Sequence, residues 1–182
     1  MKRNILITAF FILTTIFSYA YEVKDDAVVF TKIIEGTGNI EQTHSNLESF
    51  FAIKYNDVNS TIKLNQVDKL IYKGIFKDLG SYAMGMWTID ANHTIEVAIK
   101  ENRVRVKIMV SEAIFRSTGN SLTQYEYSVP NSAPFTKKCS NSSVSKKSCE
   151  TAFLEIEKRA EALLLEITQF LISDNNTFED EW

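Results

Sequence analysis

The clearest pattern of hydrophobic and polar positions lies between Thr94 and Phe115. Side chains on a strand point to opposite faces with a period of two, so alternation marks a half-buried strand. Aliphatic residues alternate with polar or small ones on both sides of a polar break at 100–102. They are Ile95, Val97, Ile99, Val104, Val106, Ile108 and Val110. The pattern predicts an antiparallel hairpin with an aliphatic face that needs a cover and an opposite face that carries Arg103, Arg105 and Lys107.

A long amphipathic segment near the C-terminus provides that cover. Residues 150–172 place apolar side chains at spacings of three, four and seven, which is the period of a helix. Glu155 and Arg159 stand four apart and are expected to pair on the wet side. The apolar positions are Phe153, Ile156, Ala160, Leu163, Leu164, Ile167 and Leu171. We expect this helix to lie against one face of the sheet.

The remaining alternating segments predict further strands. Val28–Glu35 is β-branched, a second hairpin is expected from Ser60–Val67 and Lys69–Leu79, and Leu122–Val129 alternates once more. Gly74 interrupts the second arm of that hairpin, which indicates either a bulge or the close approach of a helix.

A shorter helix is expected after the turn at 36–39. Thr43 or Ser45 can serve as its N-cap, and Ser45 with Glu48 fits the capping-box pattern. Its aromatic stripe has two interpretations: a core-facing helix side, which we favour, or a surface on which a ligand stacks. The stripe consists of Leu47, Phe50, Phe51 and Tyr55.

Two other surfaces also have two interpretations. The first is a less regular segment that contains Met84, Met86 and Trp87. These residues form either an adaptable binding surface or the rim of the core. The charged face of the central hairpin is most simply a solvated face with ion pairs between strands. A cationic docking site for an anionic ligand is the alternative there.

The N-terminus has the three parts of a secretory signal. Lys2 and Arg3 precede an apolar run at 5–17, and Ser18-Tyr19-Ala20 puts small residues where a signal peptidase acts. We predict residues 1–20 to be a signal peptide cleaved between Ala20 and Tyr21. The apolar run is shorter than the ~20 residues that span a bilayer, so no transmembrane segment is expected in the mature chain.

Charge and cysteine usage fit an exported protein. Loss of Lys2 and Arg3 from 20 basic residues leaves 18 against 23 acidic ones, a net charge of −5, which argues against a nucleic-acid partner. Residues 130–149 form a polar, basic loop with Cys139 in its middle and Cys149 at its end. We predict a disulfide between them, because exported cysteines usually pair and the spacing is not that of a metal site. A single domain at 21–172 and an acidic tail at 173–182 complete the expected organisation.

The order of elements is strand, helix, four strands, an additional strand and a long helix. It resembles half of the TATA-binding protein, an α+β fold with a curved antiparallel sheet and helices on one face. Four segments between Val28 and Phe115 resemble the family called domain of unknown function 4468, small exported proteins of Gram-negative bacteria with that fold. They are VVFTKIIEG, NLESFFAIKY, KLIYKGIF and HTIEVAIKENRVRVKIMV. The resemblance implies no known activity, and on this acidic, exported chain it does not imply DNA binding.

No catalytic, metal or cofactor motif is present. His44 and His93 have no Ser, Cys or carboxylate pattern beside them that would form a triad, and phosphate-loop and zinc motifs are missing. We therefore expect a non-catalytic binding or interaction module of the cell envelope whose partner is an envelope protein. Two alternatives remain: an envelope hydrolase, or a carrier of a small apolar ligand held between sheet and helix by Phe50, Phe51, Tyr55, Trp87 and Leu164.

Overall fold

The computed structural model describes residues 21–24, 27–55, 62–82, 84–119, 124–128 and 146–176. The predicted signal peptide and Cys139 lie outside these residues. Cys149 is described and buried, but the predicted disulfide stays a prediction because its partner is not described.

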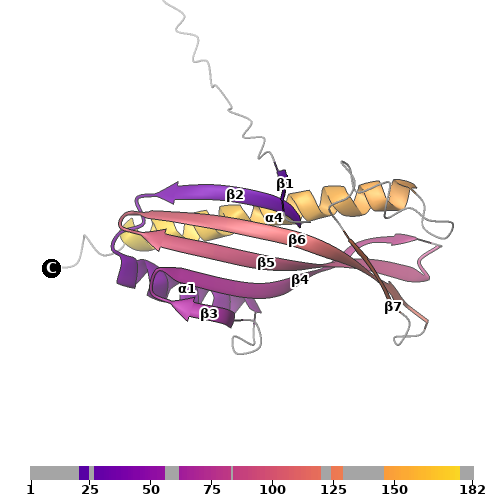
Figure 1. Ribbon diagram of the computed structural model, residues 1–182, viewed down its shortest axis with the longest axis horizontal. Coiled ribbons are helices and arrows are strands. Elements are labelled where there is room, and N and C mark those ends of the chain that lie inside the picture. The colour runs from indigo at the N-terminus through magenta and orange to yellow at the C-terminus, as the bar shows by residue number, and fades with distance from the viewer. Residues whose placement is uncertain are drawn as a thin grey trace, which may run out of the picture.

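The described residues form one antiparallel sheet and two helices (Figure 1). The strand order is β1-β2-β6-β5-β4-β3, and β7 pairs with β6 beyond the end of β2. This is the expected α+β order, except that the short strand β1 precedes it and was not expected. The strands are β1 (Glu22–Lys24), β2 (Ala27–Glu35), β3 (Ile62–Gln66), β4 (Lys69–Tyr82), β5 (Trp87–Lys100), β6 (Arg103–Ser117) and β7 (Gln124–Ser128).

The predicted central hairpin is confirmed as β5 and β6. Its tight turn is made by Glu101 and Asn102, and Asn102 takes a left-handed conformation (φ 56°) that asparagine tolerates better than most residues. All the aliphatic positions of the alternation are buried: Ile95, Val97, Ile99, Val104, Val106, Ile108 and Val110. The period-two pattern therefore identified both the strands and the face that packs.

Helices α1 (Ile40–Tyr55) and α4 (Lys146–Asn176) cover that face. In Figure 1, α4 runs along the sheet for most of its length, and α1 lies beside it over β3 and β4. Phe51 stacks on Tyr72 with ring centroids 3.9 Å apart, and Phe50 meets Phe170 of α4 at 5.3 Å. The core interpretation of the aromatic stripe is confirmed for Phe50 and Phe51.

Both helices begin earlier than expected. The amide of Gln42 donates to Asn39 Oδ1 (2.8 Å), so Asn39 is the N-cap and the expected caps at Thr43 and Ser45 are wrong. The reason is that the turn before the helix supplies its own capping side chain, while Thr43 is buried and donates its hydroxyl to Thr37 O. Helix α4 likewise extends to Lys146 and Asn176, beyond the expected bounds of 150 and 172 and into the segment expected to be a tail.

Candidate functional site

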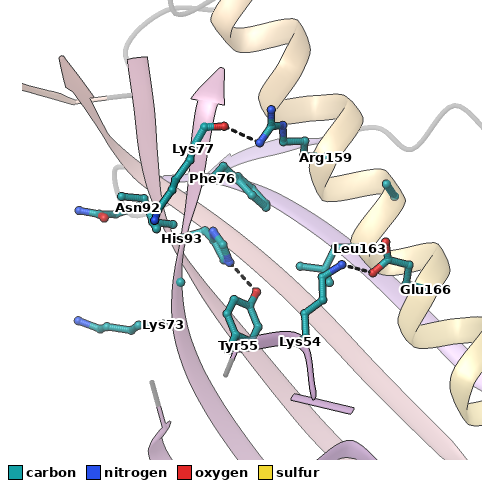
Figure 2. Close-up of a pocket in the computed structure, with 13 residues that line it drawn as sticks. Lys54, Tyr55, Lys73, Phe76, Lys77, Asn92, His93, Arg159, Leu163 and Glu166 are labelled. Atoms are coloured by element: carbon teal, nitrogen blue, oxygen red, sulfur yellow. Dashed lines mark hydrogen bonds and ion pairs between the residues drawn. The ribbon is translucent and has the colours of Figure 1, made fainter. Parts of the chain in front are cut away.

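A pocket opens beside β4, next to the end of its described pairing with β3. Within the described residues, β3 pairs with β4 as far as Tyr72 and α1 runs to Tyr55. From Lys73 onward, β4 pairs on its outer side with no other described strand. Between the end of α1, α4 and this length of β4 lies a pocket of about 780 Å³, which we call the β4 groove (Figure 2). Its lining residues are Lys54, Tyr55, Lys73, Gly74, Ile75, Phe76, Lys77, Asn92, His93, Arg159, Ala162, Leu163 and Glu166.

Gly74 is required at the base of the groove. A Cβ atom there would lie 2.5 Å from His93 Nε2 and 2.7 Å from Tyr55 Cε1, closer than any Cβ can approach. Gly74 is paired with His93 across β4 and β5, and Tyr55 is the last residue of α1. The close-approach interpretation of this glycine is therefore confirmed, and the irregularity in β4 lies further on, between Phe76 and Gly80.

The base of the groove is aromatic and uncharged. His93 is 3% exposed, its Nε2 forms a 2.9 Å hydrogen bond with the Tyr55 hydroxyl, and its ring stacks on Phe76 at 4.0 Å. Burial lowers the pKa of His93 from 6.5 to about 4, so the imidazole is neutral near pH 7. Burial, helped by the charge of Glu166, raises the pKa of Tyr55, whose hydroxyl keeps its proton.

Ionic groups form the rim on the side of α4. Lys54 of α1 pairs with Glu166 at 2.5 Å, and this ion pair closes one end of the groove (Figure 2). Arg159 donates from Nη1 to Lys77 O (2.5 Å) and from Nη2 to Asp78 O (3.3 Å) at the other end. The expected pair of Arg159 with Glu155 is not what the structure shows, because Arg159 reaches β4 and Glu155 pairs with Lys158 instead (3.5 Å).

The end of the groove near Arg159 is held by a buried carboxylate. Asp78 takes a left-handed conformation (φ 55°) at the bulge of β4, and its amide donates to Asp90 Oδ1 (2.9 Å). The other oxygen of Asp90 pairs with Arg116 Nη2 (2.7 Å). Asp90 is buried, so these two contacts stabilise its charge and fix the path of β4 where Arg159 binds it.

Three lining residues extend to the other side of β4. Figure 2 shows Lys73, Asn92 and the amino group of Lys77 pointing away from α4, whereas Tyr55 and His93 lie on the helix side. The alternation of side chains along a strand accounts for this division, since Lys73 and Lys77 have the opposite parity to Gly74 and Phe76. The groove thus has an apolar inner side and a basic outer side.

Of the residues proposed from the sequence as a binding surface, only Tyr55 lies in the groove. Phe50, Phe51 and Leu164 are in the core. Met84 and Met86 lie exposed in the turn between β4 and β5, and Trp87, half-buried, begins β5. Met84 is fully exposed, which gives the turn an apolar tip.

The basic residues Arg103, Arg105 and Lys107 lie on the sheet face opposite the buried aliphatic residues. Arg103 is 4.0 Å from Glu35, and Lys107 stands opposite Glu96, which also pairs with Lys69 at 3.8 Å. These contacts support the interpretation of a solvated face with ion pairs between strands.

Sequence reasoning missed the residues that make the groove. His93, Lys54 and Arg159 come from three different elements, and only the pairing of β4 with β5 and the ends of α1 and β3 bring them together. Gly74 was the one available signal. Among the described residues, no cluster of three His, Cys, Asp or Glu side chains could hold a metal ion. Neither described helix has the length and hydropathy needed to cross a membrane.

Comparisons with known proteins establish the fold. A DUF4468 family protein from Bacteroides ovatus is similar to this chain with a TM-score of 0.60 and 14% identity, over 83% of this chain and 90% of that one. A TBP-like protein from Parabacteroides distasonis is similar with a TM-score of 0.59 and 8% identity, over 82% and 96%. No family model and no curated protein matches the sequence. The chain thus has the TATA-binding-protein-like fold of these proteins, as its sequence predicted.

Proposed function

We propose that this protein is an exported, non-catalytic binding module of the cell envelope, and that it binds its partner in the β4 groove. One observation carries the proposal: a preformed groove with an aromatic base and an ionic rim lies between the described end of α1, β4 and α4. Concave sites with an apolar base and a few placed polar groups are where proteins bind partners and ligands. Export is supported by the pattern of residues 1–20.

The packing between sheet and helices favours this site over an apolar carrier. The aromatic rings expected to line an internal cavity instead contact one another, with Phe50 and Phe51 at 5.2 Å and Phe51 and Tyr72 at 3.9 Å. Leu164 is also fully buried in the same core. These side chains offer no surface to a ligand, whereas the groove has exposed residues such as Lys54 and Ala162 on its walls.

The chemistry of the groove favours binding over catalysis. A general acid or base works best when its pKa lies near the working pH. Burial lowers the pKa of His93 to about 4 and raises that of Tyr55. The pKa values of this hydrogen-bonded pair therefore lie away from neutral pH. The pair instead forms a neutral base beneath the groove.

A crosslinking experiment tests the proposal. Ala162 lies exposed on the wall of the groove, and Ala52 lies exposed on α1 and does not line it. A photo-reactive phenylalanine analogue is placed at either position in the full chain and irradiated in the native host. We expect a discrete adduct from position 162 that is absent from position 52. Equal or no adduct formation at the two positions would contradict the proposed function.

A further inference from the structure

We infer that the β4 groove binds an extended peptide as an added β-strand, with acidic side chains on one face of the peptide and apolar or aromatic ones on the other. This inference rests on the proposed function and specifies the partner. It starts from the outer edge of β4, from Lys73 to Lys77, which pairs with no other described strand. Unpaired strand edges present backbone donors and acceptors that a peptide can complete.

The register of the sheet shows which backbone groups face outward. Strands β3 and β4 are joined by the two-residue turn Val67-Asp68, so the pair that closes it, Gln66 and Lys69, exchanges hydrogen bonds. Outward-facing groups recur at every second residue along a strand, which places those of Lys73 and Ile75 on the open edge. The carbonyl of Lys77, next in this series, accepts from Arg159 (2.5 Å) rather than from a strand. That contact ends the open edge.

The inner side of the edge suits apolar side chains. Gly74 lets the rings of His93 and Tyr55 lie directly against β4 at the base of the groove, and Phe76 and Leu163 supply apolar walls. Alternate side chains of an added strand would point towards this side, between β4 and α4. Since His93 is neutral and buried, the base attracts no charge of its own.

The outer side suits acidic side chains. Lys73 and Lys77 are exposed, point away from α4, and form no ion pair with another described residue (Figure 2). At about 3.3 Å per residue they lie about 13 Å apart, so they would flank a peptide of about five residues. A lysine-bearing edge can also simply prevent aggregation. If the edge accepts a strand, an acidic, alternating peptide should bind to it. If the lysines only prevent aggregation, that peptide should not bind.

The test uses a fluorescein-labelled seven-residue peptide that alternates glutamate with leucine, measured by fluorescence anisotropy against the full mature chain. Two control peptides are used: one with the same composition in two blocks, and one with N-methyl groups on alternate amides facing β4. Lys73→Glu/Lys77→Glu is compared with Lys24→Glu/Lys100→Glu, which reverses the same number of exposed charges elsewhere. Circular dichroism verifies that both double variants are folded.

We expect saturable binding of the alternating peptide, weakened about tenfold or more by the block sequence, by N-methylation and by Lys73→Glu/Lys77→Glu. The Lys24→Glu/Lys100→Glu protein should bind within about twofold of the original. Equal binding of all three peptides, or no binding up to about 1 mM, overturns strand addition. If the peptide fails while position 162 still crosslinks to a specific partner, the proposed function stands and only the strand inference falls. If both fail, neither stands.

Discussion

Protonation of His93 should destabilise the fold in mildly acidic solution. The ring is 3% exposed, stacks on Phe76 and shares its Nε2 with the Tyr55 hydroxyl, while Nδ1 has no hydrogen-bond partner among the described residues. An imidazolium would therefore bury one N–H group without a partner, in surroundings that solvate charge poorly. This is why burial lowers the pKa of His93 from 6.5 to about 4.

The sign and size of the effect follow from linkage. Above pH 6.5 neither the folded nor the unfolded chain carries a proton on this ring, and stability is highest. As the pH falls from 6.5 towards 4, the unfolded chain binds a proton that the folded chain does not, so the free energy of unfolding decreases. The shift corresponds to a total loss of about 3 kcal/mol, of which about 2.5 kcal/mol is reached by pH 4.5. That is a large part of the 5–15 kcal/mol typical of a domain.

Urea unfolding at pH 7 and pH 4.5 measures this loss, with His93→Gln as the control. The variant keeps a polar side chain that does not titrate, and every other residue is the same in the two proteins. We expect the original protein to lose about 2.5 kcal/mol more than the variant between the two pH values. A difference below about 0.5 kcal/mol would contradict this prediction, because the pKa of His93 would then be nearly the same in the folded and unfolded states.

Substitutions at three further positions test individual contacts by urea unfolding at pH 7. Gly74→Ala should cost about 1–3 kcal/mol, because its Cβ would overlap His93, and an unchanged midpoint would mean that the rings move freely. Asn39→Ala should cost about 1 kcal/mol through loss of the α1 cap, while Asn39→Asp should restore most of it. Arg116→Ala should cost about 3 kcal/mol by leaving the Asp90 carboxylate buried without its ion pair; a cost near zero would show that solvent replaces the guanidinium.

The layers of the fold could be predicted from sequence because each depends on a local period. Ile95 and Val106 alternate with polar residues, which places them on the one face of the sheet that is buried. Ile156 and Leu163 repeat at helical spacing, which places them on the buried side of α4. Element ends were less predictable. Asn39, Thr43 and Ser45 can each cap a helix, and the choice among them depends on how the turn before α1 packs, which no local pattern contains.

The groove could not be predicted because no single segment contains it. Its base requires Gly74 to face His93 across two strands and Tyr55 to end a helix directly above them. From the sequence, Tyr55 belonged to a core-facing stripe, and His93 was one of two isolated histidines. Only Gly74 stood out in the sequence, because a glycine in the middle of a strand weakens the strand. Its presence there indicates that another group lies close to the backbone.

The fold and the side chains of the groove make separate contributions to binding. Neighbours of 14% and 8% identity share the fold, so the fold tolerates replacement of most side chains. The described edge of β4 from Lys73 presents backbone groups, and Lys73 and Lys77 place exposed charges beside it. If strand addition occurs, backbone pairing should therefore supply affinity that any extended peptide can use, and these two lysines should decide which peptide is preferred.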